Sequence, residues 1–443
     1  MRMTAFAILL TIAAVGINPD SAAALADRDK LALTDQPYAY YLSLSSQRSP
    51  EARERLVKVV RTTLPSLSRK TYLGEQLPVR VNETLLRIDT RGLGWEESLP
   101  HVLATHYPYR PDLRAHKIRD RHGRWVAQHP LVFDAAWFVA SVTDPIITGD
   151  SQYRLIYGKP PKTTAEFRKF WQVGEDPQYL FQFHEANSGV GVNPDRNVQQ
   201  RDTAIRTFHW ATQDSEFPVG DKDPGNYGKP LKFDAGEEFA GMPKQLAGAQ
   251  GAAIAWWLGN GKGQRQEVAP ARIVTDKNAI ASTEIRNTKS CKVCHVEGVR
   301  PLTKDGFREF RAAGARVALD KHAQLLVDQQ YQAGVAQQVE ADNQQFAKFL
   351  EMCNGSAWTP GVEAVSYEKV VRAYDAPLTR EQAARELYLH DDEFRLALGA
   401  YSKKYSLPRR LAGLAEGLTI SRAQWITDFH IAWEVRSKWP ELK

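Results

Sequence analysis

The 443-residue chain contains little cysteine, with three residues in all: Cys291, Cys294 and Cys353. An exported scaffold held together by disulfides uses more cysteines, and uses them in pairs. Three is an odd number and a small one for this length. We therefore expect these thiols to serve a purpose other than cross-linking the chain.

Dense charge of one sign is also missing. The 58 basic and 52 acidic residues leave a formal net charge of +6, which is small for a chain of this length. The basic residues form no dense Lys/Arg run. A nucleic-acid-binding surface needs a concentrated basic stripe, so we expect no nucleic-acid partner. The mild excess fits an acidic protein partner or an anionic envelope surface equally well.

Long hydrophobic runs are absent after the N-terminus. There, Arg2 precedes an uncharged apolar stretch, Ala5 to Ile17, which Asn18-Pro19-Asp20 interrupts before Ala24-Leu25-Ala26. This order predicts a signal peptide over residues 1–26, with cleavage after Ala26. The apolar stretch is too short to span a bilayer as a stable helix. We therefore expect an exported, periplasmic chain with no transmembrane segment in its mature form.

The remaining composition, 43% hydrophobic and 25% charged, is ordinary for a globular protein, and the length favours two domains. Residues 27–276 mix helix and strand signals and predict an α+β domain. Residues 277–443 predict an all-α domain. The clearest local predictions are helices at 133–143, 164–173, 305–313, 324–352, 380–388, 391–401 and 421–438, a strand at 85–90, and a hairpin around the glycine-rich turn 259–263.

One motif carries chemistry: Cys291-Lys292-Val293-Cys294-His295, the attachment pattern of c-type haem. Two thiols one helical turn apart can each add to a vinyl group on one edge of a porphyrin, and the adjacent histidine can then bind the iron from below. With three Cys and eleven His, chance gives this pentad in about one shuffled sequence in three thousand. Thioether attachment takes place outside the cytoplasm, which agrees with the predicted export of this chain.

Two other readings of the pentad remain open. A zinc site would need two further ligands at motif spacing, and the chain has no second CxxC and no HxxxH. A redox-active dithiol of the thioredoxin type would need a βαβ setting, which the pattern does not suggest. Haem c therefore explains the motif best. Cys353 then has no cysteine partner in the chain, and we expect a buried thiol.

The second axial ligand is less well determined. Met352, 57 residues after His295 at the end of the predicted long helix, is the first candidate, since a thioether favours electron transfer at high potential. His322 is the next, followed by Met242 and His390. The position could also be open, which would permit small-molecule binding or peroxide chemistry.

Several further segments accompany the pentad: Leu86-Arg87-Ile88-Asp89-Thr90-Arg91, Gly94-Trp95, 136–140, 187–190, 272–274 and Ile420-Ser421-Arg422. With these the chain resembles large exported bacterial proteins with a single CxxCH, which are grouped as cytochrome c domain-containing proteins. The resemblance implies haem binding and electron transfer by Cys291, Cys294 and His295. It implies no particular substrate.

Together these observations predict an α+β N-terminal domain followed by a cytochrome c-like haem domain. The expected function is one-electron transfer in the periplasm, with a redox partner protein in the envelope, rather than catalysis. Two alternatives remain: a haem enzyme or sensor with an open distal site, and an envelope binding or structural protein whose haem site is vestigial.

Overall fold

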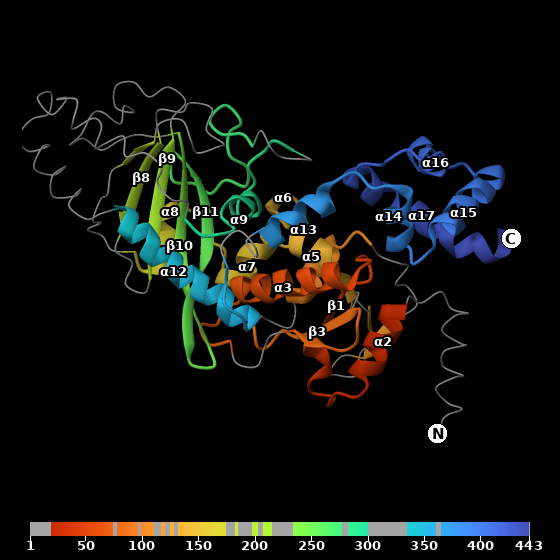
Figure 1. Ribbon diagram of the computed structural model, residues 1–443, viewed down its shortest axis with the longest axis horizontal. Coiled ribbons are helices and arrows are strands. Elements are labelled where there is room, and N and C mark those ends of the chain that lie inside the picture. The colour runs from red at the N-terminus through yellow and green to blue at the C-terminus, as the bar shows by residue number, and fades with distance from the viewer. Residues whose placement is uncertain are drawn as a thin grey trace, which may run out of the picture. The chain divides into compact units, whose positions relative to one another are not determined.

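The computed structural model describes residues 19–73, 78–95, 99–109, 117–119, 125–127, 132–173, 182–184, 197–202, 207–214, 234–276, 282–299, 335–359 and 365–442. It is a mixed α/β structure with its sheets in the N-terminal part and a mostly helical C-terminal region (Figure 1). The coarse prediction of fold class is thereby confirmed.

The contacts group the chain into two compact units. The first unit comprises residues 1–60, 76–140 and 370–443, and the second comprises residues 61–75 and 141–369. The boundary predicted near residue 276 therefore falls inside the second unit. The chain enters the second unit twice and returns to the first, so the units are not consecutive halves of the sequence.

The first unit contains a four-stranded sheet in the order β2-β3-β1-β6. Its strands are Val79–Arg80, Leu85–Asp89, Ala39–Ser43 and Val132–Asp134. β1 is antiparallel to β3 and parallel to β6. Strand β3 confirms the strand predicted at 85–90, whereas the helix predicted at 133–143 divides into β6 and α5 (Ala135–Ser141).

Helix α2 (Pro19–Arg28) packs on this sheet. Its Ala24 is fully buried in a cluster with Ala39, Tyr41 and Leu85. The buried carboxylate of Asp20 accepts hydrogen bonds from hydroxyl groups of β1, the loop after it and the loop before β3. Cleavage after Ala26 would remove most of this helix.

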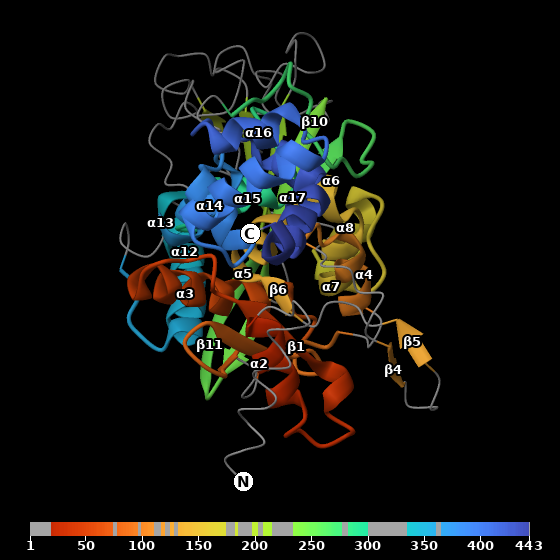
Figure 2. The same cartoon turned by 90° about the vertical axis from the view of Figure 1, so that its right-hand side faces the viewer.

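Four helices of the first unit pack together near the C-terminus (Figure 2): α14 (Arg380–Glu386), α15 (Asp391–Lys404), α16 (Arg409–Ala415) and α17 (Arg422–Leu442). They confirm the helices predicted at 380–388, 391–401 and 421–438. α14 begins with a capping box at Thr379. At the start of α17, the Ser421 hydroxyl accepts from Gln424 N. Arg422 joins them by donating to Glu386 at 2.6 Å.

The second unit is built on a five-stranded antiparallel sheet in the order β11-β10-β9-β8-β7. The strands are β7 (Gln182–His184), β8 (Asn197–Asp202), β9 (His209–Asp214), β10 (Ala235–Leu246) and β11 (Ala249–Asn260). The main hairpin joins β10 to β11 through Ala247 and Gly248, both at positive φ, as a tight hairpin turn requires.

The hairpin predicted around residues 259–263 is a smaller feature. The turn exists, since Gly263 N donates to Asn260 O and Gly259 forms a bridge with Arg265. The long partner of β11, however, is β10 on its other side. The sequence pattern missed this because Ala247-Gly248 lacks the Asn-Gly or Asp-Gly signature of such turns.

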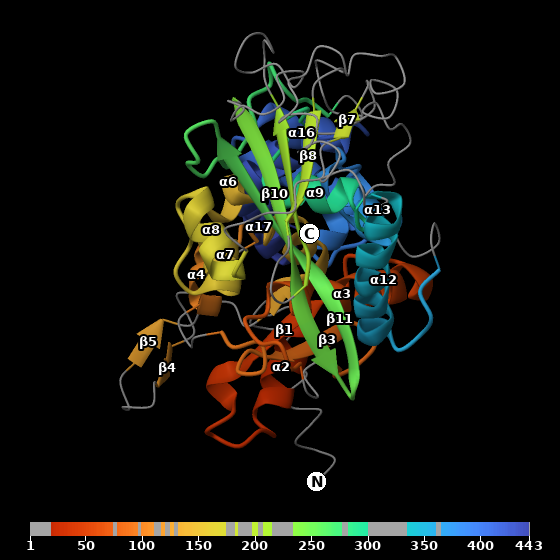
Figure 3. The same ribbon diagram turned by 90° about the vertical axis from the view of Figure 1, so that its left-hand side faces the viewer.

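Helices cover both faces of this sheet (Figure 3). On one face, Trp257 of β11 stacks on Phe167 of α8 (Thr164–Trp171), with ring centroids 5.3 Å apart. On the other face, Trp210 of β9 donates to Asp342 of α12 (Val335–Asn354) at 2.9 Å. α12 also crosses β11 at Gly251, where a Cβ would collide with the backbone of Phe349.

The remaining helices are α3 (Pro50–Leu67), α4 (Leu99–His106), α6 (Pro145–Thr148), α7 (Ser151–Tyr157), α9 (Lys289–Cys294) and α13 (Val365–Asp375). α8 and α12 agree with helices predicted at 164–173 and 324–352, although residues 324–334 lie outside the described part. The helix predicted at 305–313 also lies outside it. Among the described helices, none has the length and apolar character needed to cross a bilayer.

Lys244 of β10 makes the stability of the second unit depend on pH. Its buried ammonium donates to the carbonyls of Ser68 and Lys70 at 2.7 and 2.9 Å, and burial lowers the pKa of Lys244 to about 7. In the unfolded chain the pKa returns to its usual 10.5. Between these values the unfolded state binds the extra proton, so stability rises with pH.

We expect the free energy of unfolding of the second unit to increase from pH 7 to pH 9, and Lys244→Met to reduce that slope. Urea denaturation at three pH values measures it. Burial also raises the pKa of the neighbouring Cys353 from 9.0 to about 12. Between pH 9 and about 10.5 its opposite contribution cancels that of Lys244, and the sign reverses only above that range. The exposed Lys262 provides the control, and equal slopes in Lys244→Met and Lys262→Met would contradict the assignment.

Candidate cofactor-attachment site

The pentad lies in α9 and the turn after it. Cys291 and Cys294 are one helical turn apart in α9, and His295 is the residue that ends the helix. All three cysteines of the chain are free thiols. Cys291 is buried and Cys294 is half-buried. The sequence therefore places the three predicted residues together through local helix geometry alone.

The loop before α9 is held firmly. Asn287, fully buried, donates to the Tyr153 hydroxyl at 2.7 Å, and the buried Asp144 carboxylate accepts from Arg286 at 2.8 Å and Lys289 at 3.3 Å. Between them Thr288 has a positive φ of 65°, which is strained for a β-branched residue. The buried ion pairs and hydrogen bonds on either side stabilise this conformation, and they fix where α9 begins.

The imidazole of His295 has a defined direction. Its Nδ1 lies 3.0 Å from the carbonyl oxygen of Gly298. A carbonyl can only accept, so Nδ1 carries the proton and the lone pair of the neutral ring is on Nε2. Histidines that bind metals are typically oriented by such a second hydrogen bond. The ring also packs against Trp256 and Phe239, with centroids 4.8 and 6.1 Å away.

The turn that supplies the Gly298 carbonyl is held by α12. Asn343 accepts from Val299 N at 2.7 Å and donates to Val299 O at 2.8 Å. Gly298 has a φ of 98°, and a Cβ there would collide with the Asn343 side chain. Only glycine fits this position. Asn343 therefore positions the carbonyl that orients His295.

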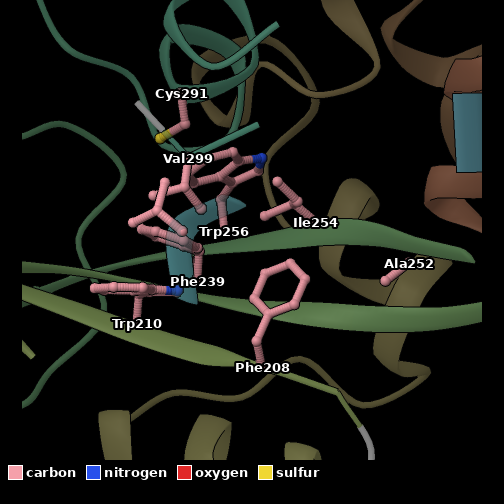
Figure 4. Close-up of a cluster of buried hydrophobic side chains, with 9 residues drawn as sticks. Phe208, Trp210, Phe239, Ala252, Ile254, Trp256, Cys291 and Val299 are labelled. Carbon is pink, nitrogen blue, oxygen red and sulfur yellow. The ribbon is translucent and has the colours of Figure 1, made fainter. Parts of the chain in front are cut away.

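An aromatic cluster lies beneath the motif (Figure 4). Its members are Phe208, Trp210, Phe239, Ala252, Ile254, Trp256, Cys291, Val299 and Val339, with Phe346 packed against them. The Cys291 side chain points from α9 toward the sheet. Burial, and then the nearby Glu237 carboxylate, raise the pKa of the Cys291 thiol well above its usual range. This thiol is therefore protonated in the folded chain.

These observations fit a haem held by the motif. Neither thiol is in a disulfide, the two stand one turn apart, and the adjacent imidazole keeps its lone pair on the nitrogen that an iron would need. Most side chains around Cys291 and His295 are apolar and aromatic, as a porphyrin requires, and the Glu237 carboxylate beside Cys291 is the polar exception. Among the described residues no group of three His, Cys, Asp or Glu could hold a metal ion, so a zinc site finds no support there.

The structure does not bring Met352 to His295. Asn343 contacts the turn after His295, and Met352 follows nine residues later, about 13 Å farther along α12 at ~1.5 Å per residue. Met352 instead lines a surface depression with Gly248, Ala249 and Gln250 at the β10–β11 turn. Met352 as distal ligand stays a prediction that this arrangement does not favour.

Of the other candidates for the second axial position, the structure bears directly on Met242. Met242 is three residues from Phe239 in β10, so its side chain points to the opposite face of the strand from the His295 ring. His390 precedes α15 in the first unit. His322 lies outside the described residues. Cys353 is fully buried, as predicted for a thiol without a cysteine partner.

Several residues of the site were not predicted from sequence. Asn343, Asp342 and Trp210 act through contacts between segments more than 40 residues apart, and nothing in their local sequence signals this. Comparison of the chain with protein-family models, with curated proteins and with solved structures gives no match. The geometry of the site is therefore the basis for inferring function.

Replacing Asn343 with leucine should destabilise the second unit. The change removes both hydrogen bonds to Val299 and leaves a main-chain N–H without its acceptor in a half-buried turn, at a cost of about 2–3 kcal/mol. Chemical denaturation measures the loss. Gln344→Ala, on the exposed side of the same helix, should change stability by less than about 0.5 kcal/mol. Equal effects of the two substitutions would show that the Asn343 contact is not needed.

Proposed function

We propose that the chain is an exported c-type cytochrome that carries one covalent haem and transfers single electrons. Cys291 and Cys294 form the two thioethers, and His295 is the proximal ligand of the iron. The observation that carries the proposal is the His295 imidazole, whose Nδ1 is held by the Gly298 carbonyl and which directly follows two cysteines at attachment spacing that form no disulfide.

Each part of the site has a task in this function. The thioethers keep the cofactor attached without a large enclosing pocket. The Gly298 carbonyl, held by Asn343, fixes the imidazole and makes it more electron-rich, which stabilises the ferric state. Trp256 and Phe239 exclude water from the proximal side. Bound haem supplies the one-electron redox couple, and the protein sets its potential through ligand, hydrogen bonding and burial.

In this proposal the chain acts in the periplasm and exchanges electrons with a partner protein of the envelope. The signal-like N-terminus and the need for extracytoplasmic thioether formation support that location. The first unit, a sheet with a helical cluster, would serve docking or attachment in the envelope. Nucleic acid is not part of the proposal.

Covalent haem attachment is directly testable. We expect protein exported from cells that carry cytochrome c maturation factors to stain for haem after denaturing electrophoresis. The Cys291→Ser/Cys294→Ser double variant should lose the stain, because both thioethers are then missing. Cys353→Ala is the matched control and should keep it, because Cys353 is buried apart from the motif. A colourless wild-type protein, soluble and correctly exported, would overturn the proposal.

A second candidate function is a haem enzyme or sensor with an open distal position. The placement of Met352 at the β10–β11 turn and of Met242 on the opposite face of β10 favours it. In this case the iron would have one protein ligand instead of the two of an electron carrier, and small molecules could reach it.

Absorption spectra distinguish the two candidates. With an open position, the ferrous spectrum should shift on addition of carbon monoxide, and Met352→Leu should leave the ferric spectrum unchanged. Loss of a weak long-wavelength charge-transfer band in Met352→Leu would instead identify Met352 as the distal ligand and restore the simple electron carrier.

A further inference from the structure

The residues expected to be cut away with the signal peptide are part of a folded core. Asp20, at the start of α2, is only 2% exposed. Its carboxylate accepts from the hydroxyls of Ser43, Ser45 (2.6 Å) and Thr84 (2.8 Å). These three residues come from β1, the loop after it and the loop before β3, so a single side chain ties α2 to two segments of the sheet.

The rest of α2 is bound in the same way. Ala24 is fully buried against Ala39, Tyr41 and Leu85. At the end of the helix, Asp27 accepts from the Tyr41 hydroxyl at 3.0 Å and from Arg87 at 2.8 Å. A signal peptide has no such partners in the mature protein, because it is removed before the protein folds.

Cleavage after Ala26 would damage this core in two ways. It would remove the carboxylate that three hydroxyl groups share, all of them on side chains that are buried or half-buried. It would also uncover the apolar surface of Tyr41 and Leu85 that Ala24 now covers. The segment from Pro19 to Ala26 therefore belongs to the first unit.

We propose that the exported chain keeps α2, and that signal peptidase cuts ahead of Pro19, after Gly16. Ala14-Val15-Gly16 offers the small-x-small pattern that the peptidase needs. The uncharged stretch from Ala5 to Ala13 that precedes it has nine residues, within the usual length of a hydrophobic signal region. The mature protein then begins at Ile17, two residues before the helix.

Mass spectrometry and N-terminal sequencing of the full-length protein, recovered after export, test the position directly. We expect Ile17 as the first residue. A protein that begins at Asp27, or one that still begins at Met1, would overturn the proposal. This result does not depend on haem, so it can fail or succeed separately from the proposed redox function.

A pair of substitutions provides a second test. Gly16→Leu places a bulky residue at the proposed cleavage site and should lead to accumulation of the uncleaved precursor. Ala26→Leu, at an exposed position of α2, should leave processing unchanged. The reverse pattern would place the cut after Ala26 and refute the proposal.

The thermal stability of the exported protein provides a third test. Asp20→Asn should lower the midpoint of thermal unfolding by roughly 5 °C or more, because the charged acceptor of three hydroxyl groups is lost. Asp29→Asn, at an exposed position just after α2, should have little effect. If Asp20 is absent from the mature chain, the two variants will unfold at the same temperature as the wild type.

Discussion

The paired hydrogen bonds between Asn343 and the main chain of Val299 are the constraint on which the candidate site depends. They fix the turn after His295, and that turn supplies the carbonyl that orients the imidazole. α12 is in turn held on the sheet by the hydrogen bond from Trp210 to Asp342 and by its close approach to Gly251. The direction of one ring thus depends on a sheet, a helix and a glycine turn acting together.

Under the proposed function, this dependence explains why the pentad alone would not determine the properties of a bound iron. Local spacing brings the two thiols and the imidazole together in any helix of this sequence. The potential of a haem depends on the hydrogen bonding and burial around its ligands. Those are supplied here by Trp256, Phe239 and Asn343, residues of β11, β10 and α12 rather than of the motif.

The sequence predicted features whose physical cause is local. The proximity of the pentad residues, the burial of Cys353 and the helix predicted at 380–388 each depend on residues within one or two turns of a helix, or on counting cysteines. The pairing of β10 with β11 was missed because Ala247-Gly248 carries no strong turn signature, although both residues adopt the positive φ that the turn needs. The placement of Met352 could not be predicted, since it depends on how α12 crosses β11.

The division of the chain into units shows the same limit. The described secondary structure does change near residue 276, from mixed helix and strand to mostly helix. This change does not coincide with a boundary between the two units. The sheet strands β9, β10 and β11 share a core with α9 and α12, which follow the sheet in sequence, so these elements belong to one unit. Composition along a chain reports which elements form, whereas the long-range packing of their apolar faces decides which elements belong together.

The N-terminus shows how one pattern can satisfy two different physical demands. Signal peptidase accepts small residues flanking its cut, and a helix that packs closely on a sheet also needs small residues at the contact. In Ala24-Leu25-Ala26 one alanine meets both requirements, because Ala24 is buried against Ala39, whereas Ala26 is exposed. Sequence alone cannot separate these readings. The Asp20 carboxylate supports the proposal that the helix is retained, because its three hydroxyl donors lie on β1, the loop after it and the loop before β3.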